Sequence, residues 1–392
     1  MANQDHLNIL LEEDIGAWND WRKENPDIQP DLSEADLSFG DLQAGNFSFT
    51  NLDGANLMRA FCSEADFSQA SLKGADIMEV YFENAIMPGC DLSDADCSGA
   101  RFIGTRLQGA NLANADLSMA VMVDAILVEA NLEGAELTAC VASQANFQGA
   151  NLRQAGCASA NLGEADFSEA DLSGADLTTA NLVGANFTGA NMQAASCTSA
   201  ILIDAKLIDA VADDADFSMA NFQSASLHGA SLKNASLLGA SFVQADLQNA
   251  VIDGANVYGV SAWDIEKEGL SQKALNIIAD DDEAPITVDD LEVALYTHQL
   301  LNNEKIRDLM NASSRKSVLI LGRFTPPERK AVLDELREKL REYDLVPMIF
   351  DFDRPTVCLV STNVWCPRRR HRTTTENQVN TQSHEVHKTW LL

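Results

Sequence analysis

Large apolar residues recur at every fifth position over more than half of the chain. From Leu32 to Val257 the pattern covers 46 consecutive positions, which hold 24 Leu, 10 Phe, 4 Cys, 3 Met, 2 Ile, 2 Ala and 1 Val. The residue two places before each of them is Ala in 38 of the 46 repeats, and Asp or Asn often stands between the two. A period of five matches neither the 3.6-residue repeat of a helix nor the two-residue alternation of a flat strand. The pattern therefore excludes both for this region.

A chain that turns a corner every five residues accounts for this period. The large residue and the Ala would point inward, and the other three residues would face water. Four such sides close a coil of about 20 residues, and about 11.5 coils stacked at the ~4.8 Å strand spacing give a rod of roughly 55 Å. Like residues should then recur at 20-residue intervals, and they do. One column holds Phe47, Phe67, Phe147, Phe167 and Phe187, and another holds Phe82, Phe102, Phe222 and Phe242.

The repeated A-[D/N]-[L/F]-x-x pattern resembles the pentapeptide-repeat proteins. This resemblance implies a right-handed quadrilateral β-helix, an all-β solenoid, which we assign to residues 31–262. Six cysteines occupy interior positions of the pattern, and we interpret them as small buried apolar residues. They are Cys62, Cys90, Cys97, Cys140, Cys157 and Cys197.

The two ends of a solenoid need caps because they would otherwise expose the interior. Residues 1–30 are predicted to form an N-terminal capping helix, since residues 5–22 place apolar side chains at helical spacing. At the other end Trp263 is a candidate to cover the last coil. Residues 263–315 are interpreted as an acidic linker followed by a helix, with Thr287 and Asp290 at its start and an apolar face that docks on a partner surface.

Residues 316–356 read as a small, incomplete α/β segment. The apolar run 317–322 predicts a strand, residues 325–344 a capped helix, and residues 345–350 a second strand. Gly322, Arg323 and Thr325 form a weak candidate anion site at the start of that helix. The segment resembles TIR-like domains, which act in signalling and protein–protein contact and in some cases hydrolyse NAD. The later helix that carries the NAD-hydrolysing glutamate in such domains has no counterpart in this sequence.

The last segment, residues 357–392, departs from the rest in composition. It holds five basic and two acidic residues, while the whole chain has a net charge of -32. It shows no apolar periodicity, and the sequence predicts a disordered tail. We interpret the abrupt change as the product of a displaced reading frame or a truncated gene.

The overall charge limits the classes of partner. With 59 acidic and 27 basic residues, the chain is poorly suited to bind nucleic acid or an anionic membrane through charge. No apolar run approaches the ~20 residues of a membrane helix. The acidic N-terminus and the absence of paired cysteine spacing indicate a cytoplasmic protein. No residue pattern indicates a metal or a cofactor.

Outward residues just before the large residue are usually Asp, Asn or Ser, but several are apolar. We predict that they form a surface for a protein partner or for self-association, with Arg101 and Arg106 among them. The alternative is that β-branched residues are tolerated there because they favour strands. The surface comprises Phe61, Tyr81, Val121 and Val141 in one column, Ile86 and Ile126 on the adjacent side, and Ile103, Val123 and Val128 beside them.

Three functions remain open from the sequence. The preferred one is a non-catalytic protein–protein interaction scaffold, with signalling through the TIR-like segment. The second is a mimic of DNA that inhibits DNA gyrase or another DNA-binding protein, as some pentapeptide-repeat proteins do. The third is an enzyme that hydrolyses NAD or a nucleotide, which the incomplete α/β segment disfavours.

Overall fold

The computed structural model describes residues 2–10, 14–278, 286–301, 317–322, 336, 339–340 and 346–351. The chain divides into two compact units, Met1–Arg315 and Lys316–Leu392. The predicted tail and two residues of the predicted anion site, Arg323 and Thr325, lie outside the described residues.

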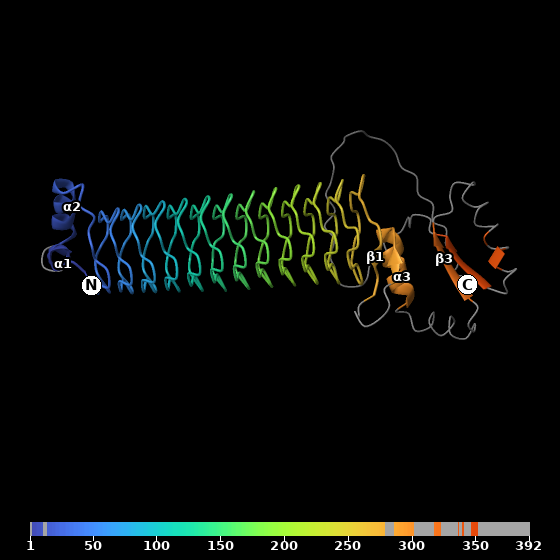
Figure 1. Ribbon diagram of the computed structural model, residues 1–392. Coiled ribbons are helices and arrows are strands. Elements are labelled where there is room, and N and C mark those ends of the chain that lie inside the picture. The colour runs from blue at the N-terminus through green and yellow to red at the C-terminus, as the bar shows by residue number, and fades with distance from the viewer. Residues whose placement is uncertain are drawn as a thin grey trace, which may run out of the picture. The chain divides into compact units, whose positions relative to one another are not determined.

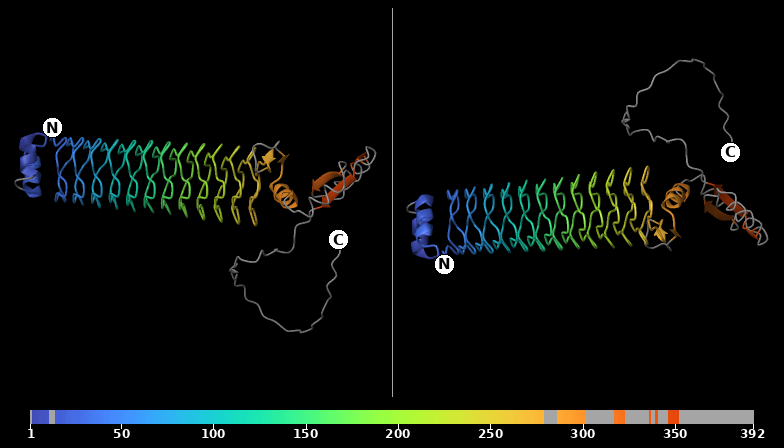
Figure 2. Two further views of the ribbon diagram at one scale, coloured as in Figure 1. Left: turned by 90° about the horizontal axis from the view of Figure 1, so that it is seen from below. Right: turned by 90° about the horizontal axis from the view of Figure 1, so that it is seen from above.

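The first unit is a stack of coils along one axis (Figures 1 and 2). Each coil has four sides, because turns recur every five residues and one coil takes 20 residues. Parallel bridges join residues 20 positions apart, from Asp31 and Asn51 to Asn256 and Asn276, so that the ladder continues past residue 262. All 46 large residues of the pattern are buried, as predicted. The Phe columns are also confirmed, because the rings of Phe147 and Phe167 stack at 4.8 Å between centroids and those of Phe82 and Phe102 at 5.2 Å.

A repeat that begins with Asn, such as residues 131–135, can satisfy all five of its backbone N–H groups. In residues 131–135, Asn131 donates to Ala110 of the preceding coil, while Leu132 and Gly134 donate to the following coil. Ala135 donates to Leu132 and closes a tight turn in which Gly134 has a φ of 66°. The N–H of Glu133 donates to the side-chain oxygen of Asn131 (3.3 Å). Asp or Asn before the large residue is therefore part of the backbone hydrogen-bond scheme.

Two short helices, α1 (Gln4–Asn8) and α2 (Ile15–Glu24), occupy the N-terminal end. The single helix expected over residues 5–22 is wrong, because Asp14 is extended and its side chain caps α2 by accepting from the N–H of Ala17 (2.9 Å). Trp18 on α2 is fully buried, stacks on Phe47 at 5.5 Å and donates to the carbonyl of Asn46. This side chain extends the interior aromatic column into the helix that covers it.

The C-terminal end of the stack is closed by the chain itself. Strand β1 (Leu275–Asn276) pairs antiparallel with β2 (Thr287–Val288), and α3 (Leu291–Leu301) follows. Leu291 and Ala294 of α3 are buried in the same apolar core as Leu275. Two expectations are therefore wrong. Trp263 is 48% exposed and does not cover the last coil, and Leu291 and Ala294 of α3 pack on the chain's own solenoid.

The second unit contains β3 (Ser317–Gly322) and β4 (Val346–Asp351). They pair in parallel, with Ser317 opposite Val346 and Gly322 opposite Asp351. Leu336, Lys339 and Leu340, between the two strands in the sequence, are helical. A parallel pair requires a long crossover connection, and the sequence supplies 23 residues between Gly322 and Val346.

Candidate functional site

The four sides of the coil carry different side chains. We name the sides by the outward residues of one coil: side I holds Val121, side II Ile126, side III Asn131 and side IV Glu136, and each belongs to a column at 20-residue intervals. The two turn residues between one side and the next form a corner, so that residues 123–124 lie at corner I–II, 128–129 at corner II–III, 133–134 at corner III–IV and 138–139 at corner IV–I. The predicted surface lies on adjacent parts of the rod. Phe61, Tyr81, Val121 and Val141 are on side I, Ile86 and Ile126 are on side II, Ile103 and Val123 are at corner I–II, and Val128 is at corner II–III.

Side I carries an ordered group of aromatic and charged side chains. The rings of Phe61 and Tyr81 stack at 5.0 Å, and the guanidinium of Arg101 lies 5.8 Å from the centroid of the Tyr81 ring. Arg101 also donates to Glu83 at 2.6 Å, which neutralises its charge locally. Phe61 is nevertheless 44% exposed. These contacts restrain large side chains at the surface of the rod.

Arg106 occupies the next side of the same coil. It is bridged on side II between Ile86 and Ile126 and is exposed. Within the part of the chain that the structure describes, Arg106 makes no ion pair, although residues 31–260 contain 30 acidic residues and seven basic ones. A cation flanked by isoleucines can hydrogen-bond to a carboxylate or carbonyl of another molecule.

The same coils leave backbone donors open. Where Phe, Tyr, Arg or Val replaces Asp or Asn, the residue two places later loses the side-chain acceptor of its N–H. The N–H groups of Ser63, Glu83, Ile103, Val123 and Ser143 accordingly have no acceptor among the described residues. They follow one another along corner I–II, one per coil at about 4.8 Å. This row adds hydrogen-bonding capacity beside the apolar side chains of side I.

The structure adds residues that the sequence pattern did not select. Phe39, Met58, Met78 and Met119 lie at corner IV–I, next to the predicted column. Phe39 is 62% exposed and Met119 is 64% exposed, and both have a φ of 59° in the third position of their turns. Bulky side chains are rare in that left-handed region. Phe39 and Met119 are 80 residues apart, which is four coils of 20, so they belong to one column. A search for apolar residues at this corner position would have found both in the sequence.

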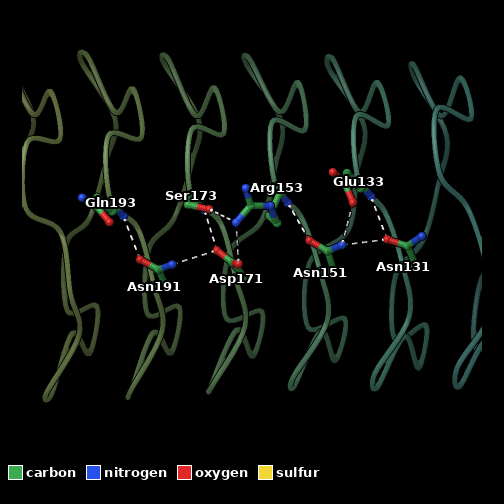
Figure 3. A network of polar contacts seen from close by, with 8 residues as sticks. All are labelled: Asn131, Glu133, Asn151, Arg153, Asp171, Ser173, Asn191 and Gln193. Carbon is green, nitrogen blue, oxygen red and sulfur yellow. Dashed lines mark hydrogen bonds and ion pairs between the residues drawn. The ribbon is translucent and has the colours of Figure 1, made fainter.

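On side III the outward side chains are mostly polar and form hydrogen bonds from one coil to the next (Figure 3). Asn151 donates to Asn131 at 2.9 Å and to Glu133 at 3.2 Å, and Asn191 donates to Asp171 at 3.0 Å. Arg153 bridges Asp171 and Ser173. The polar groups of this side satisfy one another, so the side chains of side III have a structural role in holding coils together.

The described residues also include cysteines and groups of the kinds that bind metal ions in other proteins. Six cysteines are free and buried, and burial raises the pKa of their thiols, that of Cys140 to about 12. No group of three or more His, Cys, Asp or Glu in the described ranges is placed to hold a metal ion. Among these residues, no helix is both long and apolar enough to cross a bilayer. Gly322 ends β3, but its predicted partners in the anion site are not described.

Several solved structures of pentapeptide repeat proteins are similar to the chain. HetL, which is involved in heterocyst differentiation regulation in the cyanobacterium Nostoc, is 26% identical over 64% of this chain and 94% of its own, with a TM-score of 0.29. Rfr23 from the cyanobacterium Cyanothece is 28% identical over 28% of this chain and 62% of its own, with a TM-score of 0.21. QnrB1, a plasmid-mediated fluoroquinolone resistance protein, is 20% identical over 50% of this chain and 91% of its own, with a TM-score of 0.17.

No curated protein matches the chain. The family description for pentapeptide repeats does match it, in 8 copies over residues 31–60, 46–84, 90–127, 120–154, 157–193, 190–229 and 225–261. These segments cover more than half of the chain and confirm the resemblance seen in its five-residue pattern. The protein therefore belongs to the pentapeptide-repeat family.

Proposed function

We propose that this protein is a non-catalytic scaffold that binds another protein through the nine-residue surface on sides I and II. The observation that carries the proposal is the uncovered column of Phe61, Tyr81, Val121 and Val141 on a rod whose other outward columns are mostly polar. Aromatic residues and Arg are enriched in the cores of protein interfaces, and Lys, Asp and Glu are depleted there.

The contacts within the surface support this role. Arg and Tyr are frequent energetic centres of interfaces, and Arg101 lies over Tyr81. Because stacking on Phe61 and pairing with Glu83 already restrict these side chains, binding would cost little further conformational entropy. The free cysteines are compatible with the cytoplasmic location that we also propose.

The test is a double substitution, Tyr81→Asp with Val121→Asp. We expect the folded rod to remain and binding of a partner protein from the native cell extract to fall at least tenfold, because two carboxylates would enter an apolar contact without partners. Quantitative capture on immobilised protein measures the loss, and circular dichroism with thermal melting checks the fold.

The matched control is Ser226→Asp with Ser236→Asp, which adds the same charge at outward positions of sides II and IV. This variant should retain the captured protein at the wild-type level. The proposal is wrong if the control and the test variant lose the same proteins, or if neither loses any.

One observation favours the DNA-mimic alternative. Asp76, Asp96, Asp116 and Glu136 follow one another on side IV in four successive coils. This acidic column is interrupted at Gly156 and does not extend along the whole rod, so we rank it below the scaffold. A supercoiling assay with purified DNA gyrase discriminates between the two, because only the mimic inhibits the enzyme.

Signalling through residues 316–356 is a further part of the proposal. The parallel pairing of β3 with β4 supports an α/β segment there, and the TIR-like interpretation rests on its sequence resemblance. We assign no hydrolysis of NAD to it. A nicotinamide-release assay with the purified chain tests that assignment directly.

A further inference from the structure

A stripe almost free of charge runs along the rod. We define the neutral stripe as the outward residues of side I and corner IV–I from Ser98 to Ser261. It contains no acidic residue and one basic residue, Arg101, which is paired with Glu83. By contrast, side IV and corner III–IV together carry 14 of the 30 acidic residues of positions 31–260.

We propose that the neutral stripe is the contact surface between two copies of this chain. This inference rests on the proposed scaffold function and names the partner that fits the stripe. Two copies with a net charge of -32 repel each other. They can approach closely only where neither brings carboxylates, and the stripe meets that condition over most of the rod. A surface without net charge does not need a partner of opposite charge. It can therefore pair with the same surface of a second copy, as in the commonest symmetric dimers.

Matching dimensions favour a second copy over an unrelated surface. The coils of both copies repeat at about 4.8 Å, so ridges and gaps can stay in register over many coils. Eight coils at this spacing span about 38 Å, and five residues from corner to corner span about 15 Å. This gives roughly 600 Å² on each copy, below the ~800 Å² of a standard interface and within the range of weak complexes.

The side chains of the stripe suit close contact between rods. Large exposed anchors lie at intervals, with Met119 64%, Ile201 41% and Met219 65% exposed. Small uncharged residues separate them, among them Ala158, Ser159 and Gly239. The large side chains of one copy can therefore pack over the small residues of the other without burying an unpaired charge.

The experiment is sedimentation equilibrium of the full chain over a range of concentrations at low and high salt. We expect a monomer–dimer equilibrium in which added salt strengthens the dimer, because salt screens the repulsion between the copies and the stripe itself carries no ion pair to another copy. A dimer held by ion pairs would weaken with salt instead.

Ile201→Asp should raise the dimer dissociation constant at least tenfold. Its matched control is Val211→Asp, because Val211 is 42% exposed on the opposite side III of the same coil. This control should dimerise like the wild type. A milder variant, Ile201→Asn, keeps the fold intact, since side I already carries Asn161, Asn181 and Asn221, and it should also weaken the dimer.

A chain that stays monomeric at the highest concentration in both salts overturns the inference. So does a dimer that Ile201→Asp and Val211→Asp affect equally. Ile201 lies outside the nine-residue surface, so the two proposals can fail separately. If the chain is monomeric and Tyr81→Asp with Val121→Asp abolishes capture, the scaffold proposal stands and the occupant of the surface is a different protein.

Discussion

Replacing Leu172 with Asp is expected to lower the free energy of unfolding by about 5 kcal/mol or more. Leu172 is fully buried in the middle of the rod. The substitution removes a packed apolar side chain and places a carboxylate without a partner in the interior. Because each coil contacts only its neighbours, the loss should concentrate in adjacent coils. Urea unfolding followed by circular dichroism measures the total, and hydrogen exchange over residues 150–195 locates it.

The matched control is Gln154→Asp. Gln154 is exposed at a turn with a φ of 55°, a backbone region that Asp tolerates better than most residues, and it lies outside the neutral stripe. Its effect should stay within about 0.5 kcal/mol. If Leu172→Asp and Gln154→Asp unfold at the same urea concentration, the assignment of every fifth residue to the interior is wrong.

Alkaline solution is expected to destabilise the rod steeply. Burial raises the pKa of all six described thiols well above the ordinary value of 9.0, as it does for Cys62 and Cys197. In the unfolded chain these thiols ionise from about pH 9, while in the folded chain they keep their protons. The unfolded state then binds fewer protons, so the stability falls as pH rises. Once the unfolded thiols are fully ionised, above about pH 10, each contributes at most about 1.4 kcal/mol per pH unit and six contribute at most about 8 kcal/mol per pH unit.

The contribution of the cysteines can be separated from that of other groups. Replacement of Cys157 and Cys197 by alanine should reduce the slope of stability against pH by about a third of the cysteine part. Alanine is tolerated in the interior, since Ala142 and Ala212 occupy equivalent positions. Urea midpoints between pH 8.5 and 10.5, measured with a reductant, give the slopes. Identical slopes for the two proteins would show that these thiols ionise in the folded state.

The interior of the rod could be predicted from the sequence because the large apolar residue of each repeat identifies the position that points inward. Large residues such as Leu172 recur without a break, most of them with an Ala two positions before, and parallel bridges pair outward residues that lie 20 positions apart. The position of Phe147 above Phe167 therefore follows from counting alone. Local sequence and global fold agree at nearly every coil.

The ends could not be predicted in the same way, because their contacts are not periodic. Trp18 is buried because Phe47 and the carbonyl of Asn46 lie across the first coil, which no local pattern indicates. The size of Trp263 suggests a cap, but Leu291 and Ala294 of α3 cover the core instead, from a helix whose apolar face the sequence predicts to dock on a partner surface.

The candidate site was predictable where it follows the columns. Tyr81 and Val121 were selected because they precede large residues at 20-residue spacing, and they do share side I. Phe39 and Met119 are not selected by that criterion, because they occupy the third position of a turn, which usually holds small or polar residues. The pairing of Arg101 with Glu83 joins residues 18 positions apart, and only the structure shows it.

One coil offers the most direct test of the claim that the protein binds its partner on side I. Val121, Ile126, Asn131 and Glu136 are its four successive outward residues, one on each side. A photo-crosslinking amino acid placed at each position in turn should link a protein, a second copy or another chain, from position 121 most strongly and from 126 next. Positions 131 and 136 should give little or no product. Cross-links of equal strength from all four positions, or stronger ones from 131 or 136, would contradict the account.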